Sequence, residues 1–588
     1  MKRRLVYRLL TFAIAGTMIM GSLTACGLRD AFTINNPAGS TSDNLSGGAG
    51  PDISVSSDNS AEVSPEDIEA RIKEVGESYD GIYDDSDELN IMFNTMTAES
   101  FTDGTAATPK ADNGSDYIEY EDIDWDTESY NYINENSFMS ASASPFSTFG
   151  ADVDTATYSN LRRSLYMDDG YGIPDDAVRI EEMINYFSYN YTAPADGSKF
   201  GVNATLNPCP WNEDTLLLKV GVKAEEIKPA NGSNIVFLID TSGSMFADNK
   251  LPLVQESFKI LQEQLTDKDT VSIVTYAGDW NVLLNGAKGS DHEEILEALE
   301  SLEAYGGTNG EGGILKAYDI AEENFIEGGN NRIILATDGD LNIGASSEAE
   351  LISLVEDKRN TGVFLSCLGF GNGNFKDDKM EALADYGNGN YAFIDCSREA
   401  ERVLKDEIWS TLYTVAKDVK FQIEFNPELV KGYRLIGYEN RAMAAEDFAD
   451  DTKDGGEIGS GQTVTVLYEV VPIDSEFEVP EVGSRYAEET YTGSDELLAV
   501  NIRYKEPDAD ESTLYVYPVT MSLYSETMDA DTSWAAGVAQ LGMLLKDSEY
   551  MGTTTYNSVR TRLTADPRIM DDDLRAEFLY LIDLAKNR

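Results

Sequence analysis

Five oxygen-bearing side chains of types that can bind a metal occur in three separated segments of the sequence. Asp240, Ser242 and Ser244 lie together in NIVFLIDTSGSM, Thr308 lies in YGGTNGEGG, and Asp338 follows the apolar run RIILAT. Two carboxylates and three hydroxyls form an all-oxygen ligand set, which suits Mg²⁺, Mn²⁺ or Ca²⁺ rather than zinc or copper. These residues predict a divalent-metal site, and among the three ions we favour Mg²⁺.

The segments that carry these residues alternate between strand and helix patterns. Apolar runs typical of buried strands are NIVFLID, TVSIVTYAG, NRIILATDGD, VFLSCLGFG and NYAFID, and amphipathic helical stretches separate them. Near-continuous apolar strands covered by helices indicate an α/β fold with a doubly wound, mostly parallel, Rossmann-like sheet. Ligands bind beyond the carboxyl ends of the strands in such sheets, and Asp240 and Asp338 fall at those ends.

The D-x-S-x-S motif that begins at Asp240, with the distant Thr308 and Asp338, resembles the metal-ion-dependent adhesion site (MIDAS) of von Willebrand factor type A (VWA) domains. The resemblance implies that the serine and threonine hydroxyls coordinate the metal directly, and that the aspartates bind it directly or through water. It also implies an open coordination position for an acidic residue of a protein ligand. Asp340 is either an outer acid that tunes the site or part of a surface turn.

Flanking segments extend the resemblance beyond this domain. GADVDTATYSNLRRSL and AVRIEEMINYF precede the domain, and MDDDLRAEFLYLIDLA lies near the end of the chain. These segments are similar to the flanking portions of YfbK-type bacterial VWA proteins. The resemblance implies a shared architecture but carries no known chemistry for the flanks.

Residue patterns suited to catalysis are scarce. The single histidine, His292, opens the helical stretch HEEILEALE, and no G-x-S-x-G motif surrounds Ser242. GFGNGN lacks the spacing of a dinucleotide-binding loop, and GGTNGEGG lacks the lysine of a phosphate-binding loop. We therefore expect the protein not to be an enzyme.

The charge of the chain limits its partners. Its 588 residues include 106 acidic and 44 basic side chains, which give a formal net charge of −62. Such a surface repels the phosphates of nucleic acid, so we expect no nucleic-acid partner.

The first residues have the features of a bacterial lipoprotein signal peptide. MKRRLVYR is basic, the apolar run after it is too short for a stable membrane span, and Leu-Thr-Ala-Cys26 resembles a lipobox. The resemblance implies that Cys26 is lipidated and anchors the protein extracytoplasmically, at a membrane of the bacterial cell envelope. The alternative is an ordinary cleavage site beside an incidental cysteine. Cys209, Cys367 and Cys396 are predicted to be buried thiols, with a disulfide bridge as the alternative.

The region after Cys26 is poor in Lys and Arg and rich in small polar and acidic residues, which predicts a flexible tether. SPEDIEARIKEVGESYDGI predicts one isolated helix with Ser64 as its N-cap. The later acidic and aromatic segment DYIEYEDIDWDTESYNYINENS is either a docking segment or a disordered linker. We expect ordered structure to begin near Phe146.

The patterns together predict seven segments. They are a lipoprotein signal peptide (1–25), a disordered acidic tether (26–142), an N-terminal helical flanking segment (143–200), β strands flanking the VWA domain (201–230), the VWA domain (231–406), a β-rich flanking domain (407–520) and a C-terminal helical segment (521–588). The two sets of flanking strands are expected to form one β-sandwich into which the VWA domain is inserted, because the ends of inserted domains usually lie close together.

The sequence supports one leading function and one alternative. The leading hypothesis is a surface lipoprotein that binds a protein partner through the metal, in adhesion or envelope assembly. The alternative is a structural scaffold in which the metal only stabilises the VWA fold.

Overall fold

The computed structural model describes thirteen stretches of the chain. They are residues 64–79, 82–83, 133–151, 154–167, 173–195, 197–227, 231–339, 348–371, 376–453, 455–480, 493–507, 509 and 511–588. Cys26 and Asp340 lie outside these stretches, as does most of the predicted tether. Residues 65–588 form one compact unit.

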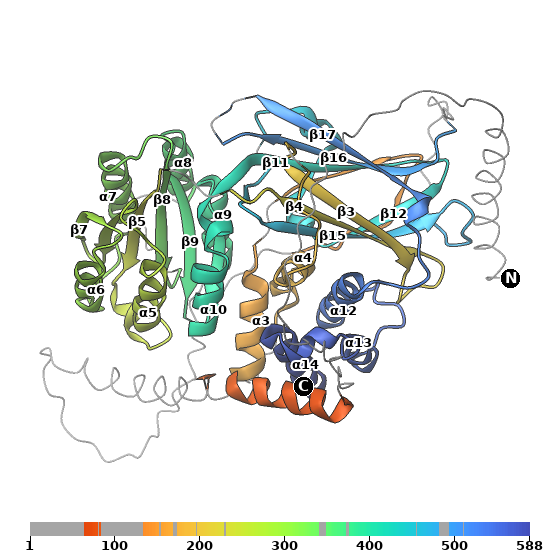
Figure 1. Ribbon diagram of the computed structural model, residues 1–588, viewed down its shortest axis with the longest axis horizontal. Coiled ribbons are helices and arrows are strands. Elements are labelled where there is room, and N and C mark those ends of the chain that lie inside the picture. Colours follow the sequence, from red (N-terminus) through yellow and green to blue (C-terminus); the bar gives the residue numbers. More distant parts are fainter. Residues whose placement is uncertain are drawn as a thin grey trace, which may run out of the picture. The chain divides into compact units, whose positions relative to one another are not determined.

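A six-stranded sheet forms the centre of the predicted VWA region (Figure 1). Its strand order is β10-β9-β8-β5-β6-β7. The strands are β5 (Ser233–Asp240), β6 (Thr270–Tyr276), β7 (Trp280–Lys288), β8 (Asn330–Thr337), β9 (Phe364–Phe370) and β10 (Tyr391–Ile394). All neighbours pair in parallel except β6 and β7. Strand β7 was not predicted, because most of its nine residues are exposed or half-buried and its apolar run is only three residues long.

Helices cover both faces of this sheet. Along β5, Phe237 packs in a core shared with α5 (Leu251–Gln262) and α6 (His292–Glu300). Its neighbour Val236 packs in a second core with three further helices. These are α7 (Gly310–Glu323), α8 (Glu348–Arg359) and α9 (Asp377–Tyr386). Successive side chains of a strand point to opposite faces, so a strand that is apolar throughout requires cover on both sides. The predicted doubly wound α/β fold is confirmed.

Two antiparallel sheets form a sandwich from strands on either side of the VWA region. The first sheet has the order β1-β12-β15-β4-β3 and the second has the order β13-β2-β11-β16-β17, with β14 also paired to β11. The strands before the VWA region are β1 (Met139–Ser140), β2 (Phe146–Gly150), β3 (Phe200–Pro208) and β4 (Leu216–Ala224). Those after it are β11 (Thr414–Phe425), β12 (Val430–Ile436), β13 (Ala442–Met443), β14 (Ile458–Gly459), β15 (Thr463–Pro472), β16 (Glu496–Lys505) and β17 (Ser512–Thr520).

The two strand sets belong to one sandwich, as predicted. β4 precedes the VWA region and pairs with β15, which follows it, from Leu216 opposite Val470 to Lys223 opposite Thr463. Apolar side chains of both sheets share one core, which includes Val220 and Val500. The chain therefore leaves the sandwich after β4 and returns to it at β11, so the VWA domain is an insertion.

Helices from both ends of the described chain form a third body (Figure 1). They are α3 (Ala156–Met167), α4 (Ile180–Asn185), α12 (Ala530–Leu545), α13 (Tyr556–Leu563) and α14 (Asp573–Asn587). They share one apolar core in which Tyr158 stacks on Tyr186 with ring centroids 3.8 Å apart, and Phe187 meets Trp534 edge to face. This body also covers the outer face of β15, where Leu467 is buried. The alternation in β15 predicted only one buried face, and the structure shows two.

Three expectations about the N-terminal region need correction. Residues 65–79 do form a helix, but it is not isolated, because Ile72 and Val75 are buried in the helical core. Described structure resumes at residue 133 rather than near Phe146, and the Ile133 amide donates to Asp176. The segment 143–200 is not purely helical, since β2 lies within it and pairs with β11. All three corrections come from long-range contacts that local periodicity does not record.

A buried ion-pair network joins the helical body to the VWA domain, and we call it the Arg162 junction. The Arg162 side chain in α3 donates to Asp395 at 2.6 and 2.8 Å and to Glu399 at 2.7 Å. Its remaining nitrogen lies 3.4 Å from Glu577 of α14. All four side chains are at most 1% exposed.

The described cysteines and helices bear on two further expectations. Cys209, Cys367 and Cys396 are free and buried, as predicted. Within the residues that the structure describes, no helix combines the length and apolar character that crossing a membrane requires.

Candidate metal centre

The two predicted acidic ligands lie at the same end of adjacent parallel strands. Asp240 is the last residue of β5, and Asp338 directly follows β8, which pairs with β5 in parallel. Both carboxylates are fully buried. β6 and β8 flank β5 on opposite sides, so this is the point at which the chain changes direction across the sheet. We call this end of the sheet the Asp240 edge.

Hydrogen bonds fix the orientation of the Asp240 carboxylate. Its Oδ1 accepts the Ser242 amide at 2.9 Å. Its Oδ2 accepts the hydroxyls of Thr337 at 2.8 Å and Tyr276 at 3.2 Å. Thr337 and Tyr276 were not predicted to belong to the site, although each ends a strand of the sheet beside Asp240. Their position at strand ends was the available signal.

The two serines present their hydroxyls as a pair. Ser242 Oγ and Ser244 Oγ lie 3.0 Å apart, in a short turn closed by the Met245 amide donating to the Ser242 carbonyl. Neighbouring ligands of an octahedral Mg²⁺, each about 2.1 Å from the ion, are roughly 3 Å apart. Ser242 is buried and Ser244 is exposed, so the pair extends from the sheet edge towards solvent. This spacing fits joint coordination of one small cation.

The loop that carries Thr308 is held against the serine turn. The Gly243 amide donates to the Gly306 carbonyl at 3.1 Å, and the Tyr305 amide donates to the Thr241 carbonyl at 2.8 Å. Gly306 has a φ of +79°, a conformation that side chains other than glycine rarely adopt. Thr308 itself is half-buried, just before the α7 N-cap Asn309. The structure thus brings all three predicted ligand segments to one edge.

The electrostatics of the edge favour a cation. Burial, followed by the nearby Asp338 charge, raises the pKa of Asp240 to about 6. One positive group is already present, because Lys250 Nζ lies 2.9 Å from Asp338 Oδ2. Lys250 was not predicted to belong to the site; it lies just before α5, and its side chain passes Gly371 to reach the edge. Two carboxylates against one ammonium leave one negative charge in a dry site, and the oxygen donors fit a divalent cation.

A second group of buried acids has a different character. One carboxylate oxygen each of Asp154, Glu182 and Glu381 lies within 4.8 Å of the others. Arg179 lies 3.0 Å from Glu182 and 3.1 Å from Glu381, and Arg441 lies 3.0 Å from Asp154 and 2.8 Å from Glu381. Guanidinium groups therefore already neutralise this group, which joins α4, α9 and the sandwich.

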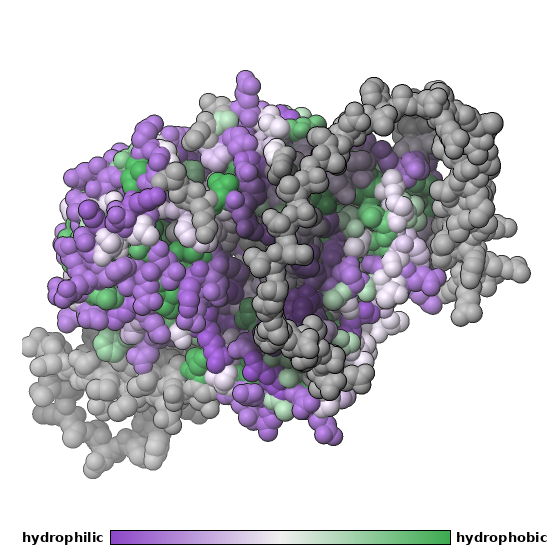
Figure 2. Space-filling view, viewed as in Figure 1, coloured by the Kyte–Doolittle hydropathy of each residue, from purple (hydrophilic) through white to green (hydrophobic). Residues whose placement is uncertain are grey.

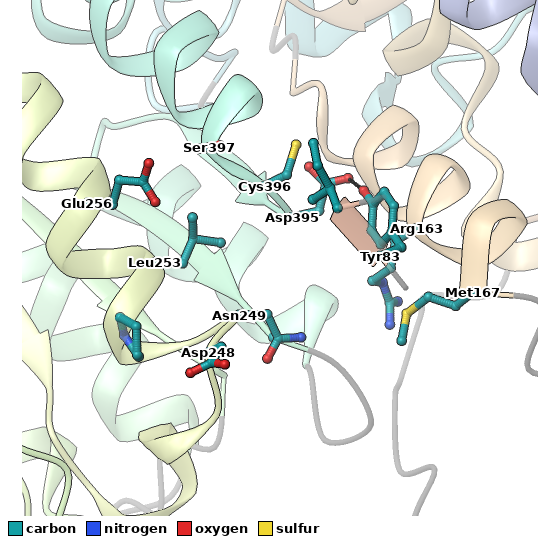
Figure 3. A pocket seen from close by; sticks show the side chains of 13 residues that line it. Tyr83, Arg163, Met167, Asp248, Asn249, Leu253, Glu256, Asp395, Cys396 and Ser397 are labelled. Atoms are coloured by element: carbon teal, nitrogen blue, oxygen red, sulfur yellow. Dashed lines mark hydrogen bonds between the residues drawn. The ribbon is translucent and has the colours of Figure 1, made fainter. Parts of the chain in front are cut away.

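A cavity of about 260 Å³ lies between α5 and the Arg162 junction, and Asp395 of that junction is one of its lining residues. Figure 3 shows Asp248, Asn249 and Leu253 on the α5 side of this cavity, with Tyr83 and Arg163 on the other side. None of the five predicted metal ligands is among its lining residues. Its walls carry both signs of charge, so the cavity by itself indicates no ligand class.

The inserted α/β sheet and the residues at its edge define a protein with a VWA domain. The family model "von Willebrand factor type A domain" matches residues 234–406, and the model "von Willebrand factor" matches residues 124–219. The model "Uncharacterized protein YfbK, C-terminal" matches residues 410–587. VWA domains commonly bind a divalent metal.

A relative that matches most of the chain places it more narrowly. The "Uncharacterized protein YfbK" of Escherichia coli (strain K12) is 41% identical over 474 residues, which cover 78% of this chain and 81% of the relative. The chain belongs to the YfbK family of VWA-domain proteins.

Two further similarities cover less or are weaker. Human inter-alpha-trypsin inhibitor heavy chain H3 is 28% identical over 182 residues, which cover 29% of this chain and 20% of that protein. The solved structure of a von Willebrand factor type A protein from Catenulispora acidiphila has a TM-score of 0.36 and 16% identity, over 66% of this chain and 96% of that chain.

Proposed function

We propose that the protein binds a protein ligand through Mg²⁺ held at the Asp240 edge. The observation that carries the proposal is the 3.0 Å pairing of the Ser242 and Ser244 hydroxyls beside two buried carboxylates. Ser242, Ser244 and Thr308 would contact the ion, and Asp240 and Asp338 would hold it directly or through water. Because Ser244 is exposed, the outer side of such an ion faces solvent.

The chemistry of the ligand follows from this donor set. Hydroxyls carry no charge, and Lys250 offsets the charge of Asp338, so an ion held here keeps much of its positive charge. A carboxylate from a protein partner then completes its coordination. The ion supplies this electrostatic attraction, while the protein orients it through the bonds that Asp240 accepts from Ser242 and Thr337.

We place the protein in the bacterial envelope as a lipoprotein anchored through Cys26, on the strength of the basic and apolar N-terminal pattern. The proposed role is adhesion or envelope assembly, and it is not catalytic. His292 pairs with Gln262 at the start of α6, and the hydroxyls of Ser242 and Ser244 bond to each other rather than to a general base.

The proposal is tested first by metal binding. The full chain, stripped with EDTA, is titrated with Mg²⁺ and Mn²⁺ by calorimetry alongside Asp240→Ala and Thr308→Ala. We expect one site whose affinity falls at least roughly 100-fold in Asp240→Ala. Asp267→Ala is the matched control, since Asp267 is an exposed acid near the opposite end of the sheet. Equal affinity in Asp240→Ala and Asp267→Ala would reject the site.

Ligand binding is tested next. Envelope proteins captured on the immobilised chain in Mg²⁺ and released by EDTA are identified, purified and measured against the wild type and Asp240→Ala. Affinity that is unchanged by EDTA and by the substitution would reject metal-dependent binding. If metal removal only lowers the melting temperature, the scaffold alternative holds instead.

A further inference from the structure

Three large aromatic side chains are exposed around the Asp240 edge. Phe246 is 55% exposed, Trp280 is 45% exposed and Tyr305 is 64% exposed. Phe246 lies two residues after Ser244, and Tyr305 lies three residues before Thr308. Burying an aromatic side chain is strongly favourable, so an exposed group of them at a candidate binding site indicates an interaction surface.

Backbone contacts bring these three residues to one surface. The serine turn that precedes Phe246 is hydrogen-bonded to the loop of Tyr305 through Gly243 and Gly306. The turn that precedes Trp280 adjoins the same loop, because a Cβ on Gly306 would lie only 3.9 Å from the Gly278 amide nitrogen.

The Trp280 ring extends this surface onto the first turns of α7. Its Cδ1 would lie 3.3 Å from a Cβ on Gly312, and Lys316 Nζ lies 5.3 Å from its ring centroid. A Cβ on Gly307 would meet nothing within 4 Å. Gly307 therefore leaves open space beside the loop of Tyr305 and Thr308, where a partner backbone can approach closely.

The charged groups on the same loops are mainly acidic. Asp248, Asp279 and Glu303 are exposed, whereas Lys250 is buried against Asp338. On the face of the whole molecule that Figure 2 shows, hydrophilic side chains predominate and hydrophobic ones lie in separate patches. A ligand that brought only acids to this surface would be repelled, so the acid that reaches the metal must have basic neighbours.

We propose that this surface, formed by Phe246, Trp280 and Tyr305, selects the ligand of the metal site. The ligand is a protein loop with one acidic residue, an aromatic or large aliphatic residue beside it, and a flanking Lys or Arg. The acid binds the metal, the apolar side chain packs against Trp280 or Tyr305, and the basic side chain faces the exposed acids. This inference rests on the proposed function, since it requires metal-dependent binding at the Asp240 edge.

Cyclic nine-residue peptides with a central Asp test the proposal. The position next to the central Asp carries Trp, Leu or Ser, and a flanking position further from the Asp carries Lys or Glu. We expect Mg²⁺-dependent binding to the full chain that is strongest with Trp or Leu together with Lys. Trp280→Ser and Tyr305→Ser each weaken that binding about 10-fold, because Trp and Tyr are frequent interface hot spots.

Tyr386→Ser is the matched control, since Tyr386 is a 41% exposed tyrosine at the end of α9. It leaves peptide binding unchanged, and all three variants keep the Mn²⁺ affinity and the melting temperature of the wild type. In one outcome, peptide binding is metal-dependent and yet has the same affinity for every set of flanking residues and in the Trp280→Ser and Tyr305→Ser variants. That result overturns this inference but leaves the proposed function standing. Binding that survives EDTA and Asp240→Ala overturns the proposed function. The absence of binding by every peptide counts against both.

Discussion

Buried acids occur both at the Asp240 edge and at the Arg162 junction, but their counter-charges differ. At the junction, one guanidinium contacts Asp395, Glu399 and Glu577, and Arg402 also donates to Glu399 at 2.6 Å. At the edge, Asp240 accepts hydrogen bonds from the Ser242 amide and from the hydroxyls of Thr337 and Tyr276, and the ammonium of Lys250 pairs with Asp338.

The difference separates acids that assemble the fold from acids that can bind a cation. Arginine forms several directed bonds with carboxylates and keeps its charge, so it joins elements permanently. Hydroxyls and amides orient a carboxylate without cancelling its charge. We therefore expect substitutions at the junction to change stability and substitutions at the edge to change metal affinity.

The largest effect is expected for Arg162→Met. It leaves three carboxylates in the core without their shared partner, which costs about 3–5 kcal/mol of unfolding free energy. Urea unfolding in EDTA measures the loss. Lys405→Met removes an exposed pair with Glu401 and should change stability by less than about 1 kcal/mol. Equal losses in the two variants would contradict a structural role for the junction.

The junction should also make stability depend on pH through Glu577. Burial raises the pKa of Glu577 to about 7 from its usual 4.5, against the opposing effect of Arg162. Between these two pKa values the folded state therefore holds a proton that the unfolded state releases. The stabilisation of the fold by protonated Glu577 is fully present below pH 4.5 and is lost as the pH rises through 7.

The Glu577→Gln variant isolates that effect. Its stability relative to the wild type should rise by roughly 3 kcal/mol between pH 4.5 and 7, and then level off. Unfolding measured at half-unit pH steps gives the difference. A constant difference across this range would show that Glu577 does not titrate with the fold.

At the edge, Asp240→Asn should separate metal affinity from stability. We expect Mn²⁺ affinity to fall at least about 100-fold, because a ligand charge is lost. In EDTA the melting temperature should not fall, since the repulsion between Asp240 and Asp338 is removed. Calorimetry and thermal unfolding give the two quantities, with Asp267→Asn as control. A large loss of stability in EDTA would make Asp240 a structural acid like those of the junction.

The smallest effect is expected for Lys250→Met. Its ammonium repels a divalent ion and competes for Asp338, so the variant should bind Mn²⁺ about 10-fold more tightly, which is about 1.4 kcal/mol. Without metal it should be less stable, because Asp338 stays buried without its partner. Lys259→Met, in the last turn of α5, is the control. Weaker metal binding in Lys250→Met would show that Lys250 supports the site.

Local sequence patterns determined the inserted α/β domain and the predicted ligand set. The apolar runs that end in Asp240 or precede Asp338 locate two buried strands and their polar ends to within a few residues. Both the parallel sheet and the sheet edge shared by the two acids could therefore be predicted. The sandwich was predictable from alternating strands on both sides of the insertion. These features depend on periodicity and on the polarity of neighbouring residues, which a sequence displays directly.

Only the tertiary structure decided which distant charges meet. Arg162 and Glu577 are 415 positions apart, and the docking of residues 65–79 places Arg71 beside Asp573. Lys250 reaches Asp338 across 88 positions, and the exposed aromatic residues share one surface because their three loops lie at one edge. A buried charge needs a partner, but its sequence neighbourhood does not say which one, because the pairing depends on the packing of whole elements.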